Sequence, residues 1–282
     1  MKTSIKALFA TVAVGEKYSK LCHDSIKTFD KCGYDSEDEL VIITDHVDLF
    51  KDVNCKIKLT VMPYYLPQGW PVVDKDNFRQ NTIVKHLLLI DALKRDTTHN
   101  LFVWYDSDTF PCVKREMLEK YTSHPAGIYY KDCHKFNNEE EIIEHHLWQR
   151  GERYYKDGLR FVGDVLKSPQ INLAKCEDNN LAFPVETCIV INRDLDDIEY
   201  KAKENKFYVV THNLVKYCLI NYLDDNYGES FELSLTIGNS FGEVKQAPVI
   251  PTFCDFHTSP SRNFEQDREF YKDMPMFKEY LA

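Results

Sequence analysis

The sequence lacks three features that would each point to a broad class of protein. It has no apolar run approaching the roughly 20 residues of a membrane-spanning helix, so no membrane span is expected. It has no cluster of lysine and arginine, and 35 basic against 45 acidic residues give a formal net charge of −10. A nucleic-acid partner is not expected, because phosphate backbones are bound by clustered basic side chains. It also shows no internal repeat and no low-complexity linker.

Paired cysteines are also lacking, because the nine cysteines are scattered without a C-x-x-C spacing. An odd count spread over a long chain does not suit a disulfide framework. We therefore expect reduced thiols that pack as small hydrophobic side chains, in a cytoplasmic protein. The apolar run 7–14 offers only a poor signal peptide, with residues 11–13 as a weak cleavage site. Its length and the Gly15 that ends it favour a first buried strand.

The chain has 282 residues, of which 43% are hydrophobic. This length and apolar content are sufficient for one large α/β domain. Strand-like and helix-like segments alternate through the first half, which predicts a mostly parallel sheet with right-handed crossovers. We expect one domain over 1–247 and an irregular C-terminal segment over 248–282. The expected strands are 5–14, 40–44, 57–62, 101–105 and 186–192, and the expected helices are 17–31, 76–95, 138–150, 203–207, 214–223 and 230–237.

Polar or turn-forming residues follow three of the expected strands. Gly15 follows the first, Asp45 the second, and the segment 106–108 follows the strand over 101–105. Ligands of parallel sheets lie outside the carboxyl ends of the strands. The pattern therefore predicts one site assembled from three separate places in the sequence.

The stretch 101–109, LFVWYDSDT, carries the strongest chemical signal in the chain. Alternate side chains of extended chain share a face, so we expect Asp106 and Asp108 to point the same way. Two neighbouring carboxylates repel unless a cation or a proton lies between them, which indicates a divalent metal site. Such aspartate pairs also occur in solvated loops. The metal is favoured here because the pair directly follows an expected buried strand, 101–105.

These segments resemble the nucleotide-sugar-dependent glycosyltransferases of the GT-A fold, and more narrowly the glycogenin and bacterial galactosyltransferase-like group. Residues 104–109, WYDSDT, resemble that group's YLDADT motif. Residues 186–192, ETCIVIN, lie where the group has NSGVMLIN, and residues 256–262, FHTSPSR, resemble its late HFxGxxKPW segment. The chain departs from the group at Glu186, Ser259 and Arg262, which replace Asn, Gly and Lys, and it lacks the final Pro-Trp.

The resemblance implies a Rossmann-like, mostly parallel sheet flanked by helices, with a nucleotide-binding half over 1–110 and an acceptor half over 111–247. The segment 248–282 would pack over the active site. The implied activity is metal-dependent transfer of a sugar from a nucleoside diphosphate sugar, UDP-sugar foremost, to a hydroxyl of a glycan or a protein.

The implied metal ligands are Asp108 and His257, with Asp106 contacting either the metal or the ribose. The metal would be Mn²⁺ or Mg²⁺, which prefer oxygen ligands with at most an imidazole added. It would neutralise the departing nucleoside diphosphate. His212 is the alternative histidine.

The donor nucleotide is expected across the strand ends. Tyr18 can stack on the base, although a half-buried helix position explains it equally well. Lys85 is preferred to Arg79 as the inward cation, because residues six apart do not share a helix face. Arg262 suits phosphate, because the guanidinium fork matches phosphate oxygens. The expected donor-binding residues are Thr11, Val12, Ala13, Val14, Tyr18, Asp45, Lys85, Asp106, Ser107 and Arg262.

The acceptor hydroxyl needs a carboxylate base if the reaction inverts the anomeric centre. Glu229, at the beginning of the late helix, is the first candidate and Glu232 the second. Acidic residues also favour helix beginnings through the helix dipole alone. A retaining enzyme needs no such base, and Glu186 would then be the residue near the anomeric centre. The sequence leaves both outcomes open.

Two other functions fit parts of the same pattern. A nucleotidyltransferase of sugar phosphates shares the fold, but it commonly has a glycine-rich basic loop after the first strand. Residues 13–17, AVGEK, are a thin version of that loop. A non-catalytic carbohydrate-binding protein is favoured by the aromatic loop 64–71, YYLPQGWP. The same loop can hold an acceptor, so it discriminates poorly.

Overall fold

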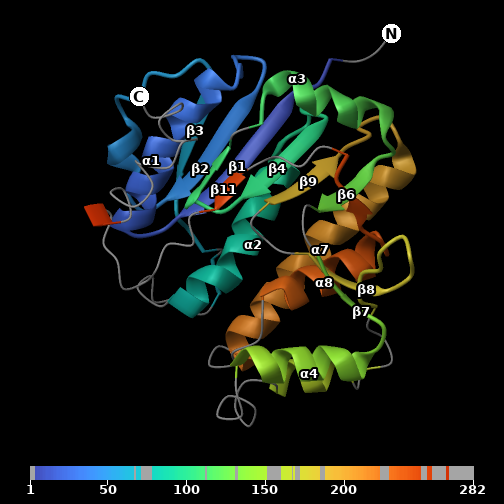
Figure 1. Cartoon of the computed structure of the whole chain (residues 1–282). Coiled ribbons are helices and arrows are strands. Elements are labelled where there is room, and N and C mark those ends of the chain that lie inside the picture. The colour runs from blue at the N-terminus through green and yellow to red at the C-terminus, as the bar shows by residue number, and fades with distance from the viewer. Residues whose placement is uncertain are drawn as a thin grey trace.

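The computed structural model describes residues 4–66, 68–70, 78–111, 113–130, 133–150, 160–166, 168, 172–184, 188–222, 229–248, 253–255 and 265–266. Side chains are described in these ranges except at 78–79, 111, 146–150, 160–161, 163, 188, 229 and 253–255. This part of the chain forms an α/β fold in which helices flank one main sheet (Figure 1).

The main sheet has seven strands in the order β10-β6-β9-β4-β1-β2-β3. Strands β4, β1, β2 and β3 are parallel neighbours, while β9 runs antiparallel between β4 and β6, and β10 lies parallel beside β6. The expected α/β class with a mostly parallel sheet is confirmed, and the sheet is mixed. The strands are β1 Ala7–Ala13, β2 Glu39–Thr44, β3 Lys58–Pro63, β4 Leu101–Tyr105, β6 Gly127–Tyr130, β9 Cys188–Asn192 and β10 Lys245–Gln246.

Strand β1 is buried along its whole length because both faces of the sheet are covered. Leu8 and Ala10 belong to the core that includes side chains of α2 (Phe78–Arg95), α7 (Ile198–Asn221) and α8 (Glu229–Ser240). Phe9 belongs to a second core, shared with α1 (Glu16–Lys31) on the opposite face. A strand covered on both faces reads as a continuous apolar run, which is why the run 7–14 is so marked in the sequence.

The two helices of the first half follow the expected pattern to different degrees. The spacing of Leu21, Ser25 and Phe29 in the sequence predicts one face of α1, and all three residues are fully buried. The buried side of α2 is wider than predicted, because this helix lies between the sheet and α7. The sequence pattern predicts a buried side formed by Ile83, Leu87, Ile90, Ala92 and Leu93, and Val84, Leu88 and Leu89 are buried in addition to these.

Helix α7 corrects one expectation, because the two helical stretches predicted over 203–207 and 214–223 are parts of one helix. It begins at Ile198, where the Asp197 carboxylate accepts a hydrogen bond from the Glu199 N–H at 2.8 Å. An Asp in this position satisfies one of the free N–H groups of the first turn. The predicted helices over 138–150 and 230–237 correspond to α4 (Glu139–Arg150) and α8.

Two small antiparallel pairs accompany the main sheet. Strand β7 (Cys133–Phe136) pairs with β8 (Leu181–Pro184), and β5 (Thr109–Pro111) pairs with β11 (Phe253–Asp255). The predicted irregular segment 248–282 therefore contains a short strand, and most of it lies outside the described residues. The remaining elements are the 3₁₀ helices η1 (Val47–Phe50) and η2 (Glu119–Ser123) and the helices α3 (Arg115–Leu118) and α6 (Arg160–Leu166).

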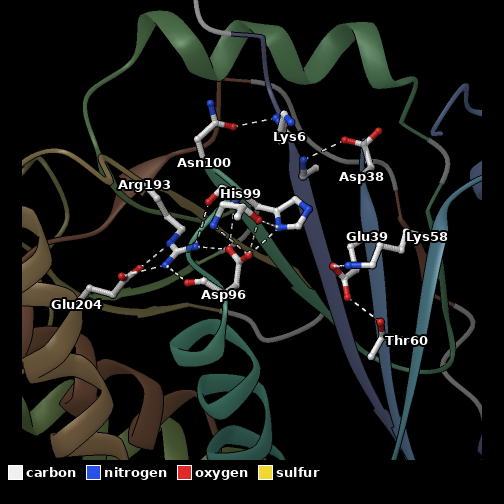
Figure 2. A network of polar contacts seen from close by, with 12 residues as sticks. Lys6, Asp38, Glu39, Lys58, Thr60, Asp96, His99, Asn100, Arg193 and Glu204 are labelled. Carbon is white, nitrogen blue, oxygen red and sulfur yellow. Dashed lines mark hydrogen bonds and ion pairs between the residues drawn. The ribbon is translucent and has the colours of Figure 1, made fainter. Parts of the chain in front are cut away.

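A network of hydrogen bonds and ion pairs lies at the edge of the sheet where the parallel strands begin (Figure 2). The buried Asp38 carboxylate accepts a hydrogen bond from the Ala7 N–H at 2.9 Å and from Arg115 Nε at 2.6 Å. The buried Arg193, directly after β9, bonds to both oxygens of Glu204 at 2.7 and 3.1 Å and to the Asp96 carboxylate. These contacts leave the opposite, carboxyl edge of the sheet as the place for a ligand.

Among the described residues, no helix has the length and hydropathy of a membrane span. The six cysteines with described side chains are free thiols, including Cys133 and Cys176, whose sulfur atoms lie 4.0 Å apart.

Candidate functional site

The carboxyl ends of four parallel strands meet at one edge of the sheet. Val14 follows β1, Asp45 follows β2, Tyr64 follows β3 and Asp106 follows β4. The predicted convergence of Gly15, Asp45 and the segment 106–108 is therefore present in the fold, because these strands are adjacent and parallel.

Gly15 and Asp45 are joined directly. The Gly15 N–H donates to Asp45 Oδ1 at 2.9 Å, and His46 Nδ1 lies 2.8 Å from the same oxygen. Gly15 has φ of +87°, a conformation that glycine adopts without a steric penalty. Burial raises the pKa of Asp45, but the hydrogen bonds from His46 and Gly15 outweigh it and leave the pKa below its ordinary value. Asp45 is thus kept as a carboxylate at this edge.

The beginning of α1 is fixed to the ends of β1 and β2. Ser19 Oγ donates to the Ala13 carbonyl at 3.2 Å and lies 2.9 Å from Thr44 Oγ1. Tyr18, the predicted stacking residue, is half-buried on the first turn of α1. Its place is compatible with both roles considered for it, a surface for a base and a packed helix position.

The segment 11–14 is predicted to face the nucleotide, and the exposure of its side chains increases toward its end. Thr11, Val12 and Ala13 are buried, and Val14 is half-buried. β1 pairs with β4 only over 7–10, so residues 11–13 extend beyond that ladder while still pairing with β2. Thr11 Oγ1 is buried without a hydrogen-bond partner in the described part of the chain. Any contact to a nucleotide from this segment is thus limited to backbone atoms and Val14.

The segment after β4 is a turn. The Thr109 N–H donates to the Asp106 carbonyl at 3.0 Å, which closes a turn over 106–109. The expectation that Asp106 and Asp108 share a face was based on extended chain and does not apply here, because the strand ends at Tyr105. Ser107 is buried in this turn, whereas both aspartates remain partly exposed.

Asp106 is paired with a lysine from α2. Lys85 Nζ lies 3.0 Å from Asp106 Oδ1, and the two side chains are 13% and 26% exposed. Burial at this level makes the pair stronger than a surface ion pair, because fewer water molecules screen it. Lys85 is the cation favoured by the sequence pattern, while the side chain of Arg79 lies outside the described ones.

One helical turn before Lys85, Asn81 contacts the end of another strand. The Tyr64 hydroxyl donates to Asn81 Oδ1 at 3.0 Å. Burial and the charge of Asp45 raise the pKa of Tyr64 to about 12. The phenol is therefore neutral, and α2 bridges the ends of β3 and β4 through residues four apart on one face.

Sequence reasoning missed His46 and the Tyr64–Asn81 bond. His46 carried a usable signal, since it directly follows Asp45 at a strand end. The hydrogen bond between Tyr64 and Asn81 had no signal in the sequence, because it depends on where α2 lies over the sheet.

Glu232 has a different environment from the one expected of a catalytic base. It is 1% exposed, and its Oε2 lies 3.5 Å from Nδ1 of His86, which is also buried. The His86 ring in turn lies on Trp104 of β4, with ring centroids 5.1 Å apart. Burial separates the Glu232 carboxylate from solvent. Glu229 is the first residue of α8, and its side chain lies outside the described ones.

Three other predicted residues, Glu186, His257 and Arg262, lie outside the described residues. The described chain nevertheless approaches two of them. Cys188, two residues after Glu186, pairs with Tyr105, and Asp255, two residues before His257, pairs with Thr109.

Of the predicted metal ligands, Asp106 and Asp108 lie within the described part of the chain and His257 lies outside it. No group of three His, Cys, Asp or Glu side chains suited to a metal ion occurs within it. The alternative ligand His212 packs edge-on against Trp70, with ring centroids 4.8 Å apart, and lies near Tyr208. This aromatic packing accounts for His212 without a metal.

No protein-family model matches the sequence, and the comparison with curated proteins gives no significant match. The assignment of function therefore depends on the residues at the carboxyl edge.

Proposed function

We propose that the chain is a metal-dependent glycosyltransferase of the GT-A fold. It transfers a sugar from a nucleoside diphosphate sugar, with UDP-sugar the favoured donor, to a hydroxyl group of a glycan or a protein. The observation that carries the proposal is the turn 106–109 at the carboxyl end of buried β4, where Lys85 meets Asp106. Both carboxylates of D-x-D and a cation thus lie at the edge where parallel sheets bind ligands.

The donor nucleotide would lie across the ends of β1 and β2. Tyr18 offers a half-buried ring at the beginning of α1, and Asp45 offers a carboxylate whose lowered pKa keeps it ready to accept hydrogen bonds. Hydroxyl groups of a ribose are suitable donors to such a carboxylate. These residues bind and orient the donor without taking part in bond cleavage.

The donor set at the turn suits Mn²⁺ or Mg²⁺. Asp106 and Asp108 supply hard oxygen ligands, and ions of this kind are commonly held by one or two carboxylates together with substrate phosphates. A cage of three protein ligands is therefore not required of the described residues. When bound, the metal supplies positive charge that neutralises the departing nucleoside diphosphate.

The C-terminal segment supports the assignment of His257 and Arg262. β11 runs beside β5, and its last residue, Asp255, pairs with Thr109, the residue that follows Asp108. His257 follows Asp255 by two residues in the sequence. In this proposal His257 is the third protein ligand, and Arg262 binds phosphate oxygens.

The base for the acceptor hydroxyl is Glu229 in an inverting reaction. Three residues later, Glu232 contacts His86, the neighbour of Lys85 in the sequence, and this contact joins the first turns of α8 to α2. A carboxylate there can take the proton of a hydroxyl that attacks the sugar. In a retaining reaction Glu186 takes the place near the anomeric centre, since the chain enters β9 opposite Tyr105.

The first test combines ligand binding with catalysis. Mn²⁺ with UDP should raise the melting temperature of the wild type, because a ligand that binds only the folded state stabilises it. Asp108→Asn should lose most of this rise, whereas Asp52→Asn, which removes an exposed carboxylate, should retain it. Hydrolysis of uridine, guanosine and cytidine nucleotide sugars then identifies the donor.

An identical response of Asp108→Asn and wild type would refute the metal assignment. Absence of turnover and binding with every donor would refute the transferase and favour a carbohydrate-binding protein. Release of pyrophosphate from a nucleoside triphosphate and a sugar phosphate would instead identify a nucleotidyltransferase.

A further inference from the structure

The ion pair between Lys85 and Asp106 occupies a carboxylate that the proposed function also needs. Lys85 Nζ lies 3.0 Å from Asp106 Oδ1, and both side chains are largely shielded from water. Both residues also make other contacts. The ammonium group is already where a positive ion would be held.

An ammonium group and a divalent ion on one carboxylate repel each other. In this shielded setting the repulsion is larger than it would be in water, because the effective dielectric constant is lower. Asp108 follows Asp106 by two residues in the same turn, so a divalent ion held by both carboxylates would lie close to the Lys85 ammonium group. A divalent ion approaching the turn therefore meets one aspartate already neutralised by a lysine.

We propose that Lys85 is a specificity-determining residue that couples metal binding to nucleotide binding. This inference rests on the proposed function. Without nucleotide, the Lys85 ammonium competes with the metal for Asp106 and weakens metal binding. With the nucleoside diphosphate present, the ammonium turns to a phosphate oxygen, and Asp106 becomes fully available. Metal and nucleotide then bind together much more tightly than either binds alone.

The coupling is reciprocal, because each ligand must change the affinity of the other by the same factor. Typical couplings of this kind amount to about 5-fold to 150-fold. The biological consequence is selectivity for the metal–nucleotide complex, since neither free metal nor free nucleotide would occupy the site effectively.

The test measures binding of Mn²⁺, UDP and both together by isothermal titration calorimetry, with electron paramagnetic resonance counting free Mn²⁺. Wild type, Lys85→Gln, Lys85→Arg and Lys120→Gln are compared. Lys120 is exposed on η2, near the edge of the sheet where the parallel strands begin. Its replacement therefore removes one positive charge at the edge opposite the turn 106–109. Circular dichroism and melting temperature establish that each variant is folded.

Lys85→Gln should bind Mn²⁺ alone about tenfold more tightly than wild type, within the range expected of such couplings. The factor by which UDP increases Mn²⁺ affinity should fall by about fivefold or more. Lys85→Arg, which keeps the positive charge, and Lys120→Gln should bind Mn²⁺ alone as the wild type does. A lysine that only binds phosphate, or only supports the fold, would not give tighter metal binding when removed.

If wild type binds both ligands and Lys85→Gln binds Mn²⁺ alone no more tightly, the inference about Lys85 is wrong and the proposed function stands. If Lys85→Gln does not fold, Lys85→Met with the same titrations replaces it, and weaker Mn²⁺ binding there overturns the inference. If wild type binds neither ligand, the proposed function and this inference fall together.

Discussion

At the scale of single residues, Asp96 shows how the fold keeps a largely buried carboxylate charged. Burial raises its pKa, but the hydrogen bond from His99 and the charges of His99 and Arg193 outweigh burial and lower the pKa to about 2. Arg193 is held in place by Glu204 on α7 (Figure 2). A carboxylate with such partners stabilises the fold only while it is ionised.

The stability contributed by Asp96 should therefore disappear in acid. Its folded pKa of about 2 lies below the ordinary value of about 3.9 expected in the unfolded chain. The contribution, about 2 kcal/mol, is fully present above about pH 4 and is lost as the pH falls toward 2. Urea denaturation from pH 7 to pH 2.5 should show the gap in unfolding free energy between wild type and Asp96→Asn shrinking with acid. A gap that stays constant would contradict this prediction.

At the scale of elements, the position of α2 determines the site. This helix carries Asn81 and Lys85 to the ends of β3 and β4, and it packs against α7 on the side away from the sheet. The buried contact of His86 with Glu232 joins α2 to α8. Lys85, which forms the ion pair with Asp106, directly precedes His86 in the helix.

A double-mutant cycle should measure the interaction between His86 and Glu232. His86→Leu leaves the Glu232 carboxylate buried without its histidine, and we expect it to cost about 3 kcal/mol of unfolding free energy. The double replacement of His86 and Glu232 by leucine should cost less than the sum of the single replacements, by about 1 kcal/mol or more. Urea denaturation measures all four proteins. Strict additivity would mean that the two side chains do not interact.

The same cycle tests the role of Glu232 in the reaction. If the folded double variant still transfers sugar, Glu232 is excluded as the base and Glu229 remains.

At the scale of the whole molecule, local patterns and long-range contacts were predictable to different degrees. The apolar runs of β1 and β4 and the face of α1 are local, and their periodicity predicted them closely. The antiparallel pairing of β9 with β4 was not predicted, because the apolar pattern of a strand does not indicate its direction. The turn at Asp106 depends on one backbone hydrogen bond from Thr109. The pairing of Tyr64 with Asn81 arises only from packing between distant segments.

In the proposed site, His257 would be the third protein ligand of the metal. His257→Ala should weaken Mn²⁺ binding in the presence of UDP by about tenfold, which corresponds to about 1.4 kcal/mol. His124→Ala, an exposed histidine next to η2, is the matched control. Electron paramagnetic resonance of free Mn²⁺ gives both affinities. An unchanged affinity would remove His257 from the ligand set.

The pairing of β11 with β5 has a consequence for biosynthesis. The two strands are separated by nearly the whole second half of the chain, so a growing polypeptide carries Asp106 and Asp108 out of the ribosome long before β11 exists. Contacts between such distant segments form late. A nascent or prematurely terminated chain would thus present the turn 106–109 before β11 can pair with β5 beside it.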